Sequence, residues 1–555
     1  MSSSSSPGSD EKSSTKANPV IAEYRILTYD SDLSEVLQPK DDLLIHEATS
    51  RGLVSTPPTL PSLSQYDNPQ TWSPGRKAFV TWLSCSATFV TTYTPGAYTA
   101  GLPQYTAEWH VSDISVYAGL TLFTILFAIA PMFLASFSEL TGRRILFITA
   151  GIVYVLSQIG SSVTPSFAGL LVTRAIAGIS CSVFSTVVGG VISDIYVTKD
   201  RNTAMAIFTG AALCGTGIGP LVSGVITEYL SWRWIYYVQI ITCGLIVAAL
   251  VALFPETRGS VLLGRKAAAL NAWGETMGEL SPFAGQQWRA SEDEDRKSVL
   301  RLVRVSLFRP IHLLFTESVV FWFSLWMSFA WSILYLTFDI IPLIFNKVYN
   351  FSSQASGLVF TAIAVASILG TIFAILQERV VTNPASRFAT FAVYGQPEAR
   401  LAFACVQSLL LPIGLFWLGA TARDSIPWII PALSLGSITL GIFSVYLAVF
   451  NYLADTYHQY ASSAIAAQAF TRNVFASVLP LAAKPLISSR LGVLGTGSLL
   501  GGIGVLLSVV PWVLLFWGPT IRQRSRLAKV DARDSKKVLC NSEKGHKVGI
   551  AAYAS

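Results

Sequence analysis

One carboxylate interrupts a long apolar stretch in the second half of the chain. Asp339 lies within residues 318–344, and a helix would place it on one face with Tyr335 and Pro342. A carboxylate held in a medium of low dielectric constant has its charged form disfavoured, so it takes up protons readily. The position predicts a residue that exchanges protons. Two structural alternatives stay open: pairing with a neighbouring helix, or a place at the outer end of the span.

Further polar side chains stand in an apolar stretch nearer the C-terminus. Gln468 and Arg472 are four residues apart and Asn473 follows directly, so their amide and guanidinium groups would face the interior together. With Tyr335, they are candidates for binding an anionic or polar part of a small molecule. Alternatively, Arg472 closes an ion pair with Asp455.

A third charged position is Arg174, in the apolar stretch 167–188. A charged residue at the centre of a membrane helix costs at least about 2.5 to 3.5 kcal/mol, so it is expected to have a partner or a task. The alternative is an arginine whose long side chain reaches the outer edge of the bilayer.

A polar loop precedes another apolar stretch and contains Glu139, Gly142, Arg143 and Arg144. Gly142 would allow a tight turn, while a carboxylate and a guanidinium could pair to hold two halves of the protein together on the cytosolic side. Arg143 and Arg144 could instead serve only to fix the topology.

A glycine-rich run occupies the middle of the apolar stretch 204–225. Gly215 and Gly219 would lie on one face of a helix, with Pro220 and Gly224 on the adjacent face, where a neighbouring helix can approach closely. Pro220 would bend the helix because it lacks a backbone donor. The run is no phosphate-binding loop, since no Lys-Ser/Thr follows it. Plain helix packing remains the alternative.

The elements that must hold these side chains are apolar blocks of roughly 20 residues, the length that crosses a hydrocarbon core about 30 Å thick. Hydrophobic residues make up 52% of the 555 residues and charged residues only 13%, below the usual 25% or so of soluble domains. We predict an all-α polytopic membrane protein with about twelve transmembrane helices in two six-helix halves. The predicted spans are 78–98, 114–134, 145–163, 167–188, 204–225, 234–254, 318–344, 357–377, 401–420, 427–450, 461–483 and 495–518.

Polar segments divide the chain into five parts. The expected parts are a disordered cytosolic tail at 1–75, a six-helix half at 76–255, a cytosolic linker at 256–312, a second six-helix half at 313–520 and a cytosolic tail at 521–555. Lys and Arg gather in alternate loops, in the linker and in the tails, which places these segments on the cytosolic side. Asn350, in the sequence Asn-Phe-Ser, then falls on the outer side as a candidate glycosylation site.

The motifs together resemble the major facilitator superfamily. Residues 135–144 resemble its loop motif G-x-L-a-D-r-x-G-r-r, with Ala135 and Glu139 in place of Gly and Asp. Residues 174–178 resemble R-x-x-q-G, and residues 215–224 resemble the antiporter motif G-x-x-x-G-P-x-x-x-G. Further strings are similar to fungal twelve-span drug:proton antiporters, namely Asp67-Asn68-Pro69, Trp232-Arg233-Trp234, Pro255-Glu256-Thr257, Asn451 to Tyr457 and Phe470 to Asn473.

This resemblance implies the major facilitator fold and the export of a drug, toxin or secondary metabolite in exchange for protons. Proton-coupled uptake of a polyamine or organic acid is the alternative. The candidates for proton coupling or gating are Asp339, Arg174, Glu139, Arg143 and Arg144. The antiporter motif comprises Gly215, Gly219, Pro220 and Gly224, and the substrate candidates are Tyr335, Gln468, Arg472 and Asn473.

Other classes of protein find little support in the sequence. The net charge of +7 comes from Lys and Arg at span ends and in tails, not from a basic stripe with aromatics, so no nucleic acid partner is expected. We find no catalytic cluster, signalling module, metal-ligand spacing or ATP-binding motif, and therefore expect neither an enzyme nor a cofactor beyond a proton gradient. The expected partners are a small-molecule substrate and the lipid bilayer. We expect a multi-pass monomer in the plasma membrane, with the vacuolar membrane as the alternative.

Overall fold

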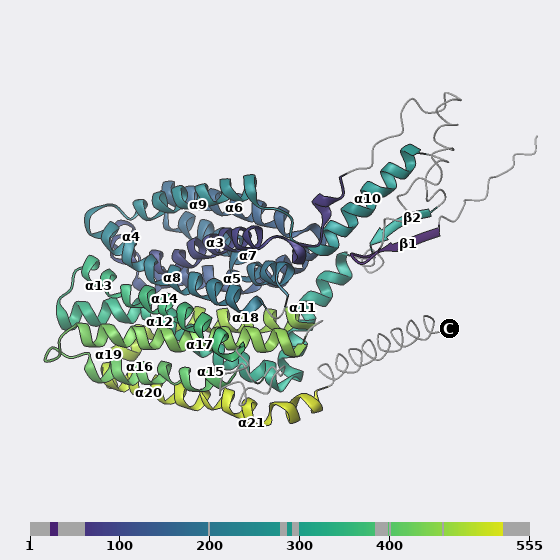
Figure 1. The fold of residues 1–555 in the computed structure, drawn as a ribbon. Helices are drawn as coiled ribbons and strands as arrows, with labels where there is room; N and C mark the ends of the chain where they lie inside the picture. Colours follow the sequence, from purple (N-terminus) through teal and green to yellow (C-terminus); the bar gives the residue numbers. More distant parts are fainter. Residues whose placement is uncertain are drawn as a thin grey trace, which may run out of the picture. The chain divides into compact units, whose positions relative to one another are not determined.

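The computed structural model describes residues 23–31, 62–197, 200–277, 286–290, 299–382, 398, 401–457 and 460–525. The chain divides into two compact units, and each is described by itself. One unit comprises Met1–Asn68 and Leu262–Lys297, and the other comprises Pro69–Val261 and Ser298–Ser555. The larger unit is a bundle of long helices (Figure 1).

The first half of the helical unit begins after the short 3-10 helix η2 (Pro69–Thr71). Its helices are α3 (Pro74–Ala100), α4 (Leu102–Trp109), α5 (Asp113–Thr141), α6 (Arg143–Val163), α7 (Phe167–Ile195), α8 (Arg201–Tyr229) and α9 (Arg233–Leu253).

The second half begins with α11 (Val299–Thr316), most of which lies in the predicted linker. Its remaining helices are α12 (Ser318–Tyr349), α13 (Ser353–Val359), α14 (Thr361–Thr382), α15 (Leu401–Gln407), α16 (Leu410–Thr421), α17 (Ile429–Tyr457), α18 (Ala461–Val478), η7 (Leu479–Ala482), α19 (Ala483–Ser488), α20 (Gly492–Leu507) and α21 (Val509–Arg524).

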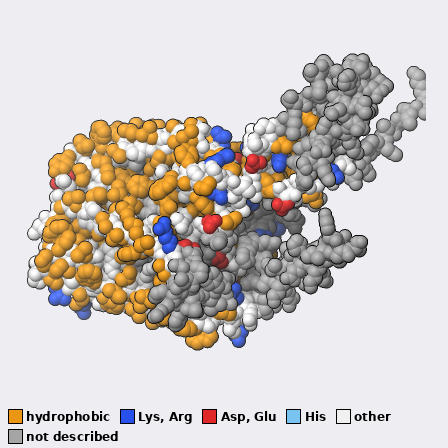
Figure 2. All heavy atoms as spheres, in the orientation of Figure 1, with side chains coloured by type: hydrophobic (Ala, Val, Ile, Leu, Met, Phe, Trp, Pro, Cys, Tyr) orange, Lys and Arg blue, Asp and Glu red, His pale blue; other side chains and the backbone are white. Residues whose placement is uncertain are grey.

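Ten helical segments in the described ranges are long and apolar enough to cross a membrane. The other two predicted spans, 78–98 and 461–483, are also helical, as α3 and α18, but they are less apolar. Their polar side chains point into the protein, as the buried Thr88, Thr94 and Gln468 illustrate. Apolar side chains cover much of the visible face of the unit (Figure 2). The prediction of an all-α polytopic membrane protein is confirmed.

Helix α8 uses its glycines to approach α3. A methyl group added at Gly215 would overlap the carbonyl oxygen of Phe89, and one added at Gly219 would overlap that of Tyr93. Because a backbone carbonyl cannot swing aside as a flexible side chain can, only glycine fits at these two contacts.

The adjacent face of α8 packs against the second half in the same manner. A methyl group on Gly224 would lie 2.8 Å from the carbonyl oxygen of Ser353 in α13, and one on Gly217 would lie 2.9 Å from the backbone nitrogen of Ala364 in α14. Helix α8 is therefore held closely between the two halves, as expected of small-residue packing in membranes.

The smaller unit joins two segments that are distant in the sequence. Strand β1 (Glu23–Leu27) pairs in parallel with β2 (Gln286–Ala290), so that Leu27 lies opposite Ala290. A small apolar core forms with α10 (Gly259–Met277), its buried members being Leu27, Ala267, Leu270 and Trp288. The Asn271 amide bonds the backbone nitrogen and oxygen of Trp288, at 2.8 and 2.9 Å. The 3-10 helix η1 (Ser64–Tyr66) belongs to the same unit.

Strand β1 lies within the stretch 1–75, for which the sequence predicts disorder, and β2 lies within the predicted linker. The stretch therefore contains an ordered strand. The strand is ordered because Leu27 is buried beside Trp288, and composition alone cannot reveal this contact.

We predict that Gly219→Ala destabilises the protein, by roughly 1–3 kcal/mol or more, because the added methyl group forces α8 away from α3. Gly244→Ala in α9 is the matched control, since no heavy atom lies within 4 Å of its Cβ position. Alanine there should be neutral or slightly stabilising in a helix. Thermal unfolding of the purified variants measures both effects. Equal melting temperatures for the two variants would contradict the close packing of α8 against α3 at Gly219.

Candidate functional site

A cluster of buried polar side chains lies where α12 and α18 pack together. Gln468, Arg472 and Asn473 of α18 are all buried, as the sequence predicts for side chains that face the interior. Among the described residues, both polar atoms of the Gln468 amide, Nε and Nη1 of Arg472 and Nδ2 of Asn473 have no hydrogen-bond partner. Unpaired polar atoms are costly in a protein interior, so this cluster is the first candidate for a substrate site.

Helix α12 contributes two adjacent stripes to the same region. Its buried serines follow at intervals of four residues and have no hydrogen-bond partner in the described ranges; they are Ser324, Ser328 and Ser332. Trp331, Tyr335 and Asp339 form the neighbouring stripe, and all three are buried. The structure thus brings the predicted substrate candidate Tyr335 and the predicted proton-coupling residue Asp339 onto one face of one helix.

The guanidinium of Arg472 lies against aromatic rings. Its central carbon is 4.5 Å from the ring centre of Trp331 and 5.2 Å from that of Tyr446 in α17. Asp455, the alternative partner considered from the sequence, instead pairs with Arg201 at 2.8 Å. Arg472 is 1% exposed, and in the described part of the chain no carboxylate pairs with it.

Arg174 occupies a similar position in the first half. Its side chain is 1% exposed, and its guanidinium carbon lies 4.0 Å from the ring centre of Tyr98 and 4.5 Å from that of Phe123. Its Nε and Nη2 atoms have no partner among the described residues. Arg174 is therefore enclosed by the helices. Tyr335 is close enough to Arg174 and to Arg472 to interact electrostatically with both.

Asp339 lies between this cluster and an open cavity that both halves line. Its side chain is 4% exposed, and Oδ2 has no hydrogen-bond partner within the described ranges. The cavity has a volume of about 300 Å³, with Tyr117 and Pro220 on the first half and Asn346 and Lys347 on the second half among its walls. Its second-half walls come from α13 and from the end of α12 that the sequence assigns to the outer side.

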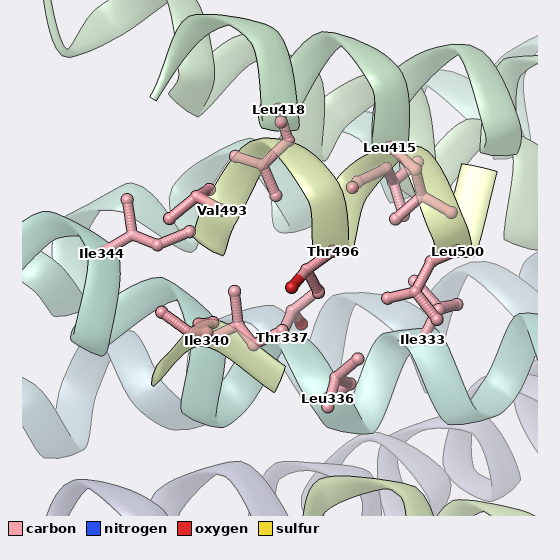
Figure 3. Close-up of a pocket in the computed structure, with 14 residues that line it drawn as sticks. Ile333, Leu336, Thr337, Ile340, Ile344, Leu415, Leu418, Val493, Thr496 and Leu500 are labelled. Carbon is pink, nitrogen blue, oxygen red and sulfur yellow. The ribbon is translucent and has the colours of Figure 1, made fainter. Parts of the chain in front are cut away.

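A second cavity lies wholly within the second half, among α12, α16, α17 and α20 (Figure 3). Its volume is about 30 Å³, room for about two water molecules. Apolar side chains such as Ile340, Leu415 and Leu500 surround it. This cavity is too small and too apolar to hold a polar organic substrate.

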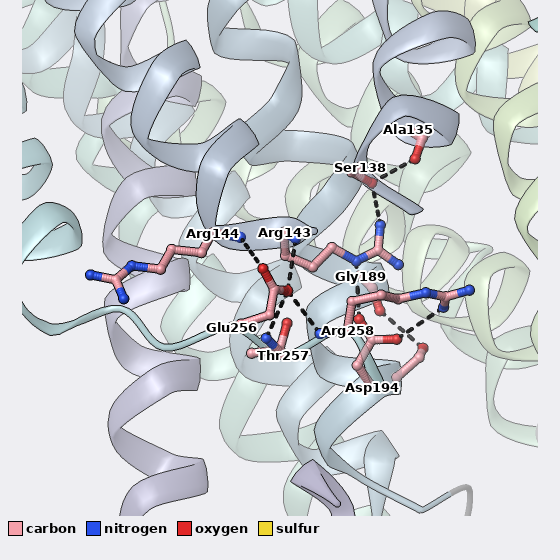
Figure 4. Close-up of polar contacts among 10 residues, drawn as sticks. Ala135, Ser138, Arg143, Arg144, Gly189, Asp194, Glu256, Thr257 and Arg258 are labelled. Atoms are coloured by element: carbon pink, nitrogen blue, oxygen red, sulfur yellow. Dashed lines mark hydrogen bonds and ion pairs between the residues drawn. The ribbon is translucent and has the colours of Figure 1, made fainter. Parts of the chain in front are cut away.

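The loop between α5 and α6 forms a charged network with the chain after α9 (Figure 4). Oε1 of Glu256 accepts a hydrogen bond from the backbone nitrogen of Arg143 at 2.9 Å, and Oε2 accepts one from that of Arg144 at 3.3 Å. Because these nitrogens begin α6, the carboxylate caps a helix N-terminus, where negative charge is stabilising. Gly142 has φ of +100°, and a methyl group there would overlap the Glu256 carboxylate, so glycine is needed on both counts.

The partner of Arg143 differs from the one the motif suggests. Its Nε lies 3.0 Å from Asp194 of α7, and its Nη1 donates to Ser138 at 2.5 Å. Arg258 reaches the other oxygen of Asp194 at 3.4 Å. Glu139, the carboxylate singled out from the sequence, forms no ion pair with any described residue. The network lies within the first half, so it does not itself join the two halves.

Polar contacts join the halves at both ends of α8. At its start, Arg201 pairs with Asp455, and Asn202 donates to Glu378 at 2.6 Å and accepts from Asn451 at 2.5 Å. Sequence reasoning missed Asn202 and Glu378, which look like ordinary polar residues at helix ends.

At its far end, Tyr229 of α8 donates to Gln354 of α13 at 2.8 Å. Asp113 of α5 pairs with Lys484 of α19 and so joins the halves a second time. The polar cluster therefore lies inside a bundle whose halves are in contact at both ends.

The other predicted positions are placed as follows. Pro220 packs its ring against Gly96, and Asn350 ends α12 in the left-handed conformation with φ of 52°. In the parts of the chain that the structure describes, no group of three or more His, Cys, Asp or Glu side chains could hold a metal ion. The arrangement suits the binding and passage of a small polar molecule.

Comparisons with known proteins agree with this geometry. A model of the Major Facilitator Superfamily matches residues 84–480. The chain is 32% identical to the MFS-type transporter phm3 of Pyrenochaetopsis sp. (82% of this chain, 92% of the relative) and 30% identical to the multidrug transporter mdrA of Aspergillus fumigatus (84% and 75%). It is 31% identical to the efflux pump FUB11 of Gibberella moniliformis (80% and 73%). The solved structure of the proton:xylose symporter XylE superposes with a TM-score of 0.58 at 15% identity, over 80% of this chain and 97% of that one.

We predict that Glu256→Gln lowers the free energy of unfolding by about 1–3 kcal/mol, because the charged acceptor for the α6 amides is lost. Glu139→Gln makes the same chemical change nearby without an ion pair to lose, and should alter stability by less than about 0.5 kcal/mol. Thermal unfolding of both purified variants is the measurement. A larger loss at Glu139 than at Glu256 would show that the motif carboxylate, and not the cap, stabilises the loop.

Proposed function

This chain belongs to the major facilitator superfamily, and on that premise we propose that it exports small organic molecules in exchange for protons. The observation that supports the exchange most strongly is Asp339. A buried carboxylate oxygen without a partner borders both the central polar cluster and a cavity between the halves. A carboxylate in this position can take a proton from the cavity and, through its change of charge, alter substrate binding in the polar cluster.

Export is favoured over uptake by the relatives and by α8. Proteins named as an efflux pump and as a multidrug transporter align with four-fifths or more of this chain. The glycine run of the antiporter type packs α8 against both halves, where it can act as the contact about which they move. The alternative, proton-coupled uptake of a polyamine or organic acid, would use the same cluster in the opposite direction.

The proposed cycle follows from the contacts at the two ends of α8. With the Arg201–Asp455 pair open, a substrate enters the central cluster from the cytosol. Closure of that end and opening at Tyr229 and Gln354 exposes the cluster to the outside. Protonation of Asp339 from the outer cavity then favours release, and the proton leaves to the cytosol when the halves rock back.

The proposal includes a location and an orientation. We place the protein in the plasma membrane as a monomer, with both tails on the cytosolic side and no cofactor other than the proton gradient. The charge bias of the loops supports this orientation. The vacuolar membrane is the alternative location.

We predict that cells from which the gene is deleted retain more of some toxic or fluorescent compounds than parental cells do. The expected reason is the loss of outward transport. Intracellular accumulation across a compound panel, with and without an imposed pH gradient, measures it. Lower accumulation in the deletion strain, reproduced over several compounds, would show uptake instead.

We also predict that Asp339→Asn abolishes pH-driven transport while the protein still folds and reaches the membrane. The amide is nearly the same size and avoids a buried charge, so folding should survive. Exchange of substrate without a pH gradient should persist, because the halves can still move. Flux into proteoliposomes of the purified variant, at imposed pH differences, is the measurement.

Asp424→Asn is the matched control, because this residue lies in an exposed loop and the change removes one charge of the same kind. It should leave pH-driven flux unchanged. Undiminished pH-driven flux in Asp339→Asn would show that protons couple through another group.

A further inference from the structure

Nitrogen donors predominate among the unpartnered polar atoms at the centre of the helical unit. Atoms that can only donate, and that have no partner in the described part of the chain, are Arg174 Nε and Nη2, Trp326 Nε1, Gln468 Nε2, Arg472 Nε and Nη1 and Asn473 Nδ2. The buried oxygens without a partner are fewer: Gln158 Oε1 and Gln468 Oε1 can only accept, and Asp339 Oδ2 accepts when the carboxyl group is ionised. A site with an excess of donors calls for a ligand rich in acceptors.

Two of these donors are permanently charged. Arg174 and Arg472 are each 1% exposed, and neither forms an ion pair with a described residue. Removing such a charge from water costs several kcal/mol, whereas stacking a buried cation on an aromatic face returns about 2 kcal/mol. The rings of Tyr98 and Trp331 therefore orient the guanidinium groups without compensating their charge.

The carboxylates that might have compensated these charges are engaged elsewhere. Asp194 pairs with Arg143, Asp455 pairs with Arg201, and Glu398 pairs with Arg522. Asp339 lies on the cavity side of the cluster and pairs with neither arginine. Because the described part of the chain offers neither arginine a carboxylate, a bound ligand is the remaining source of a negative group there.

We propose that the transported molecule carries a carboxylate, or an acidic group of similar planar shape, which binds Arg472 together with Gln468 and Asn473 and faces Arg174. This inference rests on the proposed export function and names its substrate class. A guanidinium presents its donors as a planar fork that matches a carboxylate with two hydrogen bonds.

The surroundings of the cluster also say what the rest of the molecule is like. Trp331, Tyr335 and Tyr446 are buried beside the charged groups and offer flat apolar faces. Such faces suit an unsaturated or aromatic body better than a small inorganic anion. A cationic amine is disfavoured, because two buried positive charges would repel it.

The test compares aromatic carboxylic acids with their primary amides, which have nearly the same shape but no charge. Isothermal titration calorimetry of the purified full-length protein should show acids that bind at least roughly tenfold more tightly than their amides. In Arg472→Gln this preference should disappear, and in Arg472→Lys it should be reduced, because the charge stays and the fork is lost. Arg423→Gln, the same change in an exposed loop, should keep the full preference.

Two outcomes would overturn the proposal: no acid binds more tightly than its amide, or Arg472→Gln keeps the preference. Folding is checked on the same samples, since Arg472→Gln removes an uncompensated buried charge and should raise the melting temperature of the ligand-free protein. A lower melting temperature with binding unchanged would mean that Arg472 is a structural residue.

The same compounds separate this inference from the proposed function. Deletion cells should retain the acids but not the amides. If deletion cells retain acids and amides alike, the proposed export function is supported and the proposed preference for acids is wrong. If they retain neither, and purified protein still binds acids through Arg472, the ligand class stands and the direction of transport is wrong.

Discussion

A charge inside a bundle of membrane helices must either find an opposite charge or be held at considerable cost. Arg174 and Arg472 meet this constraint incompletely, because aromatic rings support them and no described carboxylate neutralises them. Natural cores seldom keep such an arrangement without a use for it. These two charges account for the side chains around them. The surrounding groups are the rings of Tyr98, Trp331 and Tyr446, the donors of α18 and the polar stripe of α12.

Different kinds of contact hold the two halves together in different places. At the ends of α8 the contacts are hydrogen bonds and ion pairs, which can be exchanged for bonds to water at little net cost. Along the middle of α8 the contacts are glycines against backbone, where no water can enter and nothing can rotate aside. In the proposed cycle, the polar contacts at the ends of α8 are the ones that part, and the glycine contacts along the helix are the ones that persist.

The sequence predicts the residues of the candidate site better than it predicts which residues form ion pairs. Asp339, Gln468 and Arg472 can be recognised because a polar residue in an apolar block stands out, and burial in the structure agrees. The partners of Arg143 and Asp455 cannot be recognised, because Asp194 and Arg201 reach them through helix packing that spacing along the chain does not encode. Ten of twelve predicted spans meet the criteria of length and apolarity. The two exceptions are α3 and α18, whose polar side chains face the interior of the protein. These side chains lower the mean hydropathy of both helices, and those of α18 belong to the candidate site.

The pairing of β1 with β2 has a consequence for the making of the protein. The strand at Glu23–Leu27 leaves the ribosome early, but its partner at Gln286–Ala290 appears only after the whole first half has been translated. At about 5 to 20 residues per second, β1 waits roughly 10 to 50 s for the strand that it pairs with. Tyr24 and Ile26 are exposed even in the finished sheet, and until β2 has been made the backbone of β1 has no strand to pair with. The sheet can therefore form only after translation has passed the midpoint of the chain.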